Sequence, residues 1–263
     1  MLRVYLYSVA FLTGGISLLF VDPSTTPFIL ITGAMIAIVV PLLDEVVSNK
    51  RDIRLTWYCV RYANQPVRLS VSYLFRIKID NSYLLIKGKR WAQFQPVGGV
   101  YKYIEGAKGF LNDIGARPDD LVRADDVSMN DLRVRIPGRE ILAFVRWFES
   151  GRSRETSAWR EFYEELIKPG LLSLEDFPFV VTDFIRRDIR RMRFSTHARS
   201  RELLIADIYE VMPTQEQLAA LRNLKSTRHP DLVWVSEDQI VRRGAIPGEN
   251  QEIEISPTAE WIL

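Results

Sequence analysis

Two long uncharged runs open the chain and limit what its first part can fold into. No charged residue occurs from Val4 to Val21, and a second uncharged run extends from Pro23 to Leu43. As a helix, with a rise of about 1.5 Å per residue, the first run reaches roughly 27 Å, close to the ~30 Å hydrocarbon thickness of a bilayer. Each run is therefore long enough to span a membrane.

The segment that joins the two runs has the composition of a tight turn. Asp22 is followed by Pro-Ser-Thr-Thr-Pro, which favours reversal of the chain. We therefore predict a two-helix transmembrane hairpin over residues 1–46 and a juxtamembrane linker over 47–66. A cleaved signal peptide is the alternative, because Arg3 precedes an apolar stretch, but it leaves the second run without a role.

Basic residues predict the orientation of this hairpin. Arg3 precedes the first run, and three basic residues follow the second run: Lys50, Arg51 and Arg54. The connecting turn contains no lysine or arginine. Both termini are therefore expected in the cytoplasm. Each run also contains two small residues four positions apart: Ala10 and Gly14 in the first, and Gly33 and Ala37 in the second. This spacing permits close contact between helices, or it is the ordinary scatter of small residues in membrane helices.

Residues 67–263 have the pattern of a cytosolic α/β domain. The single cysteine, Cys59, excludes an intramolecular disulfide and is compatible with a reducing compartment. Strand patterns are seen at 71–87, as a hairpin with a turn at 80–82, and at 177–183, 203–209 and 232–235. Helical spacing is seen at 141–148 and 215–224. The alternation predicts an α/β/α sandwich with a mixed sheet.

Residues 151–167 have the spacing of a helix with one apolar face. Four side chains follow the i, i+3, i+4, i+7 pattern: Trp159, Phe162, Tyr163 and Leu166. Three carboxylates are expected on the opposite face: Glu161, Glu164 and Glu165. Such a face is a solvated acidic surface, a divalent-metal site, or a surface neutralised by a basic partner such as Arg160.

The run Arg160-Glu161-Phe162-Tyr163-Glu164-Glu165 resembles the R-E-U-x-E-E centre of the Nudix box, the signature of hydrolases that cleave a nucleoside diphosphate linked to another group. Gly151, nine residues before Arg160, stands where the family has the glycine of its G-E pair. The segment 96–99, Pro-Val-Gly-Gly, resembles the family's P-G-G turn. The resemblance implies a Nudix-like fold and, if a metal is retained, Mg²⁺ on Glu161, Glu164 and Glu165.

Several departures from the Nudix pattern weaken the expectation of hydrolysis. Arg152 replaces the glutamate of the G-E pair, and Ile167 replaces the glycine after the paired glutamates. An insertion at about 100–150 separates the glycine turn from the box. A hydrolase needs a positioned water and a correctly sized cleft, so we expect this box to bind a ligand rather than to cleave one.

A Nudix-like domain behind a membrane hairpin resembles the SMODS-associated NUDIX effectors of bacterial CBASS anti-phage systems. The resemblance implies a partner nucleotidyltransferase that makes a cyclic nucleotide second messenger. Binding of the messenger would drive homo-oligomerisation and disruption of the inner membrane, which kills the infected cell. No DNA or RNA partner is expected. A membrane-tethered, Mg²⁺-dependent Nudix hydrolase and a protein-binding membrane adaptor are the alternatives.

Candidate ligand-binding residues combine aromatic rings, a glycine turn and arginines: Trp91, Phe94, Gly98, Gly99, Arg160, Arg191 and Arg193. Aromatic faces beside cations suit a nucleobase near a phosphate, although a loop with a buried anchor has the same composition. The arginine-rich run 186–201 could bind phosphates, pair with the box helix or face lipid headgroups. Four aspartates of the insertion are interpreted as solvated turns, not a cation site: Asp119, Asp120, Asp125 and Asp126.

Overall fold

The computed structural model describes residues 2–88, 92–119, 129–196, 198–245, 248 and 253–263. The chain divides into two compact units. One contains residues 1–65 and 137–146, and the other contains 66–136 and 147–263. Part of the predicted insertion therefore belongs to the amino-terminal unit.

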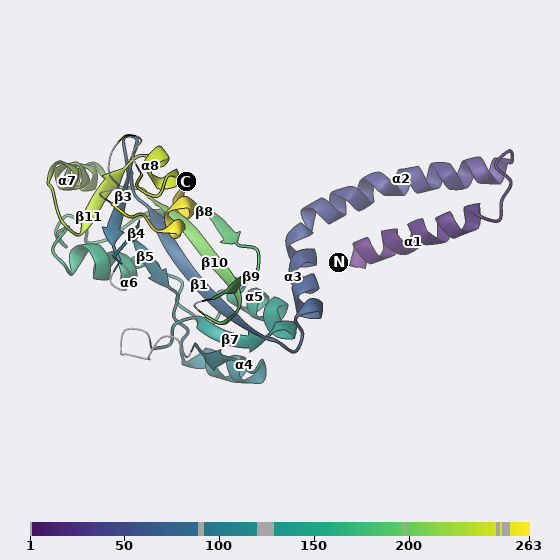
Figure 1. Ribbon diagram of the computed structural model, residues 1–263, viewed down its shortest axis with the longest axis horizontal. Helices are drawn as coiled ribbons and strands as arrows, with labels where there is room; N and C mark the ends of the chain where they lie inside the picture. Colours follow the sequence, from purple (N-terminus) through teal and green to yellow (C-terminus); the bar gives the residue numbers. More distant parts are fainter. Residues whose placement is uncertain (1, 89–91, 120–128, 197, 246–247, 249–252) are drawn as a thin grey trace. The chain divides into compact units, whose positions relative to one another are not determined.

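The amino-terminal unit contains the helices α1 (Leu2–Leu18), α2 (Thr26–Ser48) and α3 (Lys50–Arg61). The first two form a hairpin (Figure 1). Gly14 permits their close contact, because a Cβ at this position would lie 3.0 Å from Cγ of Met35. Among the described residues, α2 is the one helix long and apolar enough to cross a membrane, and none of its residues is buried. The apolar part of α1 is shorter.

The same unit fixes α3 to the start of α5 (Ile141–Glu149), which follows the short helix η2 (Gly138–Glu140). The backbone N–H of Gly138 donates to the carbonyl of Gln65 at 2.9 Å. A side chain at position 138 would clash, because its Cβ would lie 2.1 Å from the carbonyl oxygen of Tyr62. The predicted helical segment 141–148 is confirmed as α5, and the short helix η2 before it contacts α3.

The second unit is built on a seven-stranded mixed sheet. Its main path runs β6-β7-β1-β10-β8, and two short strands join it, β5 on β1 and β9 on β10. The central pair, β1 and β10, is parallel, whereas β5, β8 and β9 are antiparallel to their neighbours. The bounds are β1 (Pro66–Arg76), β5 (Gly98–Val100), β6 (Arg117–Pro118), β7 (Arg133–Pro137), β8 (Thr182–Ile189), β9 (Arg193–Ser195) and β10 (Ser200–Val211).

A smaller four-stranded sheet has the order β11-β3-β2, with β4 paired to β3. Its strands are β2 (Lys78–Ile79), β3 (Ser82–Lys87), β4 (Phe94–Pro96) and β11 (Leu232–Val235). The predicted hairpin turn is confirmed between Ile79 and Ser82, which pair directly. Asp80 adopts a positive φ of 53° there, a conformation that aspartate tolerates better than most residues.

The helices of this unit are short apart from α7. They are η1 (Glu105–Ala107), α4 (Lys108–Asp113), α6 (Trp159–Phe162), η3 (Tyr163–Ile167), α7 (Gln215–Ser226), α8 (Glu237–Val241) and η4 (Pro257–Ile262). A capping box at Thr214 and Gln217 begins α7 close to the predicted position.

Alternation along β1 divides the core between the two faces of the large sheet. Leu74 packs in one cluster with Leu85 and Val235 of the smaller sheet and with Ile262 of η4. Phe75, the next residue, points to the other face and meets Phe162 of α6, with ring centroids 5.7 Å apart. The predicted mixed α/β fold is confirmed, and β1 positions the box helix.

One predicted strand was displaced. We expected a strand at 177–183, but β8 begins at Thr182. Phe177 is fully buried, and its ring lies 5.5 Å from that of Phe162. Its apolar character therefore reflects packing under the box helix, before the chain enters the sheet.

Candidate functional site

The box helix differs from the regular helix that its spacing predicted. It begins at Trp159 instead of near Gly151, and after Phe162 it widens into a π-helical turn, η3. Lys168 donates its backbone N–H to the carbonyl of Tyr163, five residues earlier. The extra residue in this turn changes which side chains face inward. Tyr163 is 38% exposed, and Glu165 is buried at 9% exposure.

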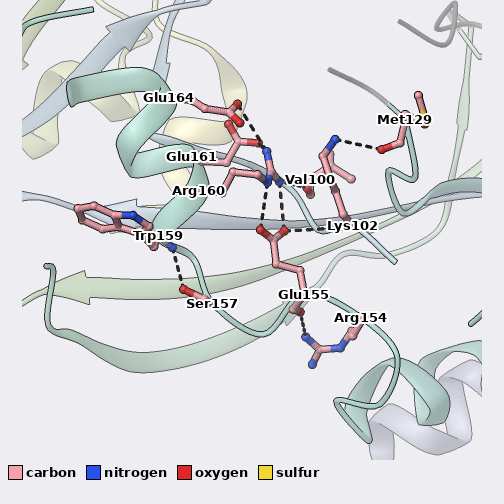
Figure 2. A network of polar contacts seen from close by, with 10 residues as sticks. All are labelled: Val100, Lys102, Met129, Arg154, Glu155, Ser157, Trp159, Arg160, Glu161 and Glu164. Carbon is pink, nitrogen blue, oxygen red and sulfur yellow. Dashed lines mark hydrogen bonds and ion pairs between the residues drawn. The ribbon is translucent and has the colours of Figure 1, made fainter. Parts of the chain in front are cut away.

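Arg160 lies among the carboxylates of the box (Figure 2). Its Nε and Nη2 donate to the two carboxylate oxygens of Glu155 at 3.0 and 3.1 Å. Its Nη1 donates to Glu161 at 2.6 Å and lies 3.6 Å from Glu164. Nη2 also donates to the carbonyl of Val100 at 2.9 Å. This two-pronged contact with Glu155 is among the stronger ion-pair geometries that arginine makes.

The surroundings of Arg160 keep its guanidinium charged. Burial acts against the charged form, but the hydrogen bonds to Glu155 and the negative charges of Glu161 and Glu155 outweigh it, so the pKa of Arg160 is raised above its usual range. Arg160 is therefore the basic partner of Glu161 and Glu164, which is one of the three interpretations of the acidic face.

Glu155 is a site residue that the sequence reasoning missed. Its carboxylate also accepts from the backbone N–H of Lys102 at 3.2 Å, and its own N–H donates to the carbonyl of Lys102 at 2.8 Å. Arg152, which replaces the glutamate of the family pattern, is exposed. The sequence does contain a signal for this role of Glu155, because Glu155 is the one acidic residue between Gly151 and Arg160. Glu155 therefore supplies a carboxylate to the box three residues after Arg152, the position where the family has a glutamate.

The glycine turn approaches the box helix closely. The backbone N–H of Gly98 donates to the buried carboxylate of Glu165 at 2.8 Å. Gly98 has a φ of +144°, and a Cβ there would lie 2.2 Å from the carbonyl oxygen of Tyr73. A Cβ on Gly99 would lie 2.0 Å from Oε1 of Glu161. Only glycine fits at Gly98, whereas a side chain at position 99 would displace the carboxylate of Glu161, so the turn and the box form one site.

The carboxylates of the box have partners within the protein. No group of three or more His, Cys, Asp or Glu side chains is arranged to hold a metal ion in the part of the chain that the structure describes. Glu161 pairs with Arg160, and Glu165 binds the glycine turn. Mg²⁺ binding by Glu161, Glu164 and Glu165 stays a prediction.

The remaining ligand-binding candidates lie apart from the box. Trp91 is outside the described residues. Phe94 is partly buried and packs against the hydrophobic core. Arg191 is exposed, and Arg193 is 70% exposed and lies 3.7 Å from Glu202 on β10.

The sheet register gives the separation between Arg193 and the glycine turn. Arg193 pairs with Glu202, whereas Gly99 pairs with Tyr73, which in turn pairs with Asp207. Five residues of strand, about 16 Å at ~3.3 Å each, therefore separate the two places along β10. The structure brings Gly98 and Gly99 together with Arg160 and leaves Arg191 and Arg193 at a different part of the sheet.

The arginines of β8 have partners inside the fold. Arg187 donates to both oxygens of buried Asp207, at 2.6 and 2.8 Å, and Asp207 also accepts from the hydroxyl of Tyr101 at 2.9 Å. Arg186 donates to the carbonyls of Trp261 and Leu263, at 2.8 Å each. The solvated-turn interpretation of Asp119 was wrong, since its carboxylate is 1% exposed and bound to Arg68. Asp120, Asp125 and Asp126 lie outside the described residues.

A cavity of about 380 Å³ adjoins the box on the side of Glu165. Its polar lining includes Lys87, His229 and Asp231, and its apolar lining includes Ile86 and Leu171. A cavity of this size, mainly apolar with a few polar groups, has the character of a small-molecule site.

Comparison with known proteins identifies the second unit. A family model described as the SMODS-associated NUDIX domain matches residues 66–263, more than half of the chain. No curated protein matches the chain.

Proposed function

This chain belongs to the SMODS-associated NUDIX domain family, and from that premise we propose that it is a membrane-bound CBASS effector that senses a cyclic nucleotide second messenger. In this proposal the Nudix-like domain binds the messenger without cleaving it. Occupancy drives homo-oligomerisation, and the clustered hairpins disrupt the inner membrane. The messenger comes from a partner nucleotidyltransferase.

The observation that carries the proposal is the departure of the box from the hydrolase pattern at Arg152 and Ile167. A Nudix hydrolase would use the acidic residues of its box for Mg²⁺, which stabilises charge and activates water. Here exposed Arg152 replaces the glutamate of the G-E pair, and the carboxylates of Glu155, Glu161 and Glu164 lie within 2.6–3.6 Å of the guanidinium of Arg160. The fold keeps its glycine turn and an adjacent cavity, which are features that binding requires. This combination favours a receptor over a hydrolase.

The hairpin supports the membrane part of the proposal. α2 is long and apolar enough to span a bilayer, and α1 packs beside it through Gly14. We propose that both helices span, with both termini in the cytoplasm. Joining several hairpins through one ligand-bound domain assembly would raise their local concentration and favour association in the membrane.

Dye release from liposomes tests the proposal. The full-length protein is reconstituted into vesicles with an entrapped fluorophore, and a panel of cyclic di- and trinucleotides is added. Release that depends on one of these nucleotides is expected. Equal release with and without every nucleotide would contradict the switch.

A parallel assay distinguishes the receptor from a hydrolase. The same protein is incubated with Mg²⁺ and dinucleoside or sugar diphosphates, and products are separated by chromatography. We expect no turnover. Turnover that is lost in Glu164→Gln would instead establish a membrane-tethered Nudix hydrolase.

A further inference from the structure

A second cavity of about 380 Å³ lies in the insertion, between α4, β6 and β7. Apolar side chains of Leu111, Pro118 and Val134 form part of its wall. Small-molecule sites range over roughly 300–1,000 Å³, so this volume is at the lower end. It suits a single nucleotide unit better than a complete cyclic dinucleotide.

Buried ion pairs hold one wall of this insertion cavity. Asp119 lines it and accepts from Nε of Arg68 at 2.6 Å, while its other oxygen lies 3.3 Å from Nη2 of Arg135. Arg68 also donates to Glu202 of β10 at 2.7 Å. These contacts tie the insertion to the central strands of the large sheet, so the cavity is part of the domain framework. A preformed pocket loses less entropy when it binds a ligand.

The rim of the cavity carries positive charge suited to a phosphate. Arg117 is exposed and has no carboxylate partner among the described residues. Lys108 lines the same cavity, but its ammonium group pairs with Glu105 at 2.7 Å. Arginine presents a planar fork of N–H donors that matches phosphate oxygens, so Arg117 is the stronger candidate.

Asp131 supplies a hydrogen-bond acceptor inside the cavity. Its carboxylate is 13% exposed and lies 3.5 Å from Nη1 of Arg133, too long for a strong hydrogen bond. No hydrogen bond to this carboxylate is found among the residues that the structure places. An ionised carboxylate accepts two parallel N–H bonds. Guanine offers such a pair from its N1–H and 2-amino groups, and adenine does not.

Asp131 also connects this cavity with the box. The charges of Arg160 and Glu161 act on Asp131, together with those of Lys102 and Arg133. Lys102 pairs with Asp131 across a β-bridge, and its backbone holds Glu155. A ligand on Asp131 would therefore alter the electrostatic environment of Arg160.

We propose that the insertion cavity binds one guanine nucleotide unit of the messenger, with the guanine N–H edge on Asp131 and a phosphate on Arg117. The inference rests on the proposed receptor function and deepens it, because it requires a messenger that contains guanine. It also gives the insertion a role in recognition.

Equilibrium binding to the full-length protein in detergent micelles tests this assignment. The probes are labelled cyclic di-GMP, 3′,3′-cyclic GMP–AMP and cyclic di-AMP. At least one guanine-containing probe is expected to bind more tightly than cyclic di-AMP. Asp131→Asn replaces one acceptor oxygen by a donor and should weaken that binding by roughly 5- to 150-fold, the range for a bidentate base contact.

Arg117→Gln provides a second variant, which leaves the base contact intact. It should weaken binding of the guanine probes and make their affinity less dependent on salt, since one phosphate contact is lost. Two exposed residues outside the cavity supply matched controls, Asp183→Asn and Arg222→Gln. Both should bind like the wild type, and melting temperatures confirm that all four variants fold.

The possible failures can be told apart. If a cyclic nucleotide binds the wild type and both cavity variants equally, the cavity assignment is overturned and the receptor function stands. Tighter binding of cyclic di-AMP overturns the assignment of guanine. If none of the probes and no cyclic trinucleotide binds, the cavity assignment and the receptor function both fail.

Discussion

At the scale of single residues, the site depends on one guanidinium that is shared by three carboxylates. Arg160 is 22% exposed and serves Glu155, Glu161 and Glu164 at once. Removing one partner of a partly buried ion pair leaves the others with an uncompensated charge, which costs more free energy than the pair itself contributes. The loss of stability on each substitution therefore depends on which charge is left without a partner.

Arg160→Ala should destabilise the folded protein by about 3 kcal/mol, because the carboxylates around it lose their shared cation. Thermal unfolding followed by circular dichroism in detergent would show a melting temperature lower by several degrees. Arg152→Ala, an exposed arginine in the same segment, is the matched control and should change stability by less than about 0.5 kcal/mol. Equal effects of the two substitutions would contradict the network.

Asp131 should make stability depend on pH. Burial raises the pKa of Asp131 from 3.8 to about 6, although Arg133 and Lys102 oppose the shift. Because the folded state holds this proton more tightly than the unfolded state, the contribution of Asp131 to stability is present below about pH 4 and is lost as the pH rises through about 6. At pH 7 the loss is at most about 3 kcal/mol, reduced by solvent screening.

Asp131→Asn should remove this pH dependence. The difference in melting temperature between Asp131→Asn and the wild type, measured from pH 4 to pH 8, should move in favour of the variant between pH 4 and pH 6.5. A difference that is constant across this range would contradict the raised pKa of Asp131.

At the scale of elements, the glycine turn and the box helix fix each other. The N–H of Gly98 binds Glu165, and the π-helical turn of η3 is what brings Glu165 inward. The three-residue strand β5 pairs with β1 at Leu74 and Tyr73. The position of the box helix on the sheet is therefore tied to the backbone conformation at Gly98.

Gly98→Ala should disrupt this contact. Its Cβ would lie 2.2 Å from the carbonyl of Tyr73, at a φ of +144° that alanine rarely adopts. We expect a loss of several kcal/mol, seen as poor expression or a low melting temperature. Gly170→Ala is the control, since Gly170 also has a positive φ, +80°, but open space at its Cβ. It should cost only about 1 kcal/mol.

The element scale also shows which parts the sequence predicted. Periodicity located β10, α7, β11 and the hairpin turn at Asp80, because each has a regular alternation, a capping box or turn residues. It did not locate the π-helical turn or the start of β8. Spacing assumes a uniform helix, whereas the inward position of Glu165 depends on a backbone N–H from a turn 67 residues away.

At the scale of the whole molecule, the proposed signal passes from a nucleotide site to a membrane hairpin. Two of the small residues in the hairpin, Gly14 and Gly33, differ in their surroundings. Gly14 faces Met35 within the hairpin, whereas a Cβ on Gly33 would meet nothing within 4 Å. The face around Gly33 is therefore open for contact between copies.

Gly33→Leu should separate assembly from insertion. The larger side chain fits within one hairpin but would hold neighbouring hairpins apart, so nucleotide-dependent dye release should fall by several-fold. Carbonate extraction should still recover the variant in the membrane fraction. Gly109→Leu, an exposed glycine with equally open surroundings in the second unit, is the control and should release dye like the wild type. Undiminished release by Gly33→Leu would exclude this face from assembly.

The sequence by itself determined the features that depend on local chemistry: the uncharged amino-terminal runs, the α/β alternation, and a Nudix-like box with Arg152 and Ile167 at departing positions. The tertiary structure decided which of the candidate residues meet. It placed Arg160 among the carboxylates, recruited Glu155, packed Phe94 against the core, and put Arg193 on another part of the sheet. The reason is physical: a charge is neutralised by whichever group the folded chain brings within reach, and sheet register and burial set that distance.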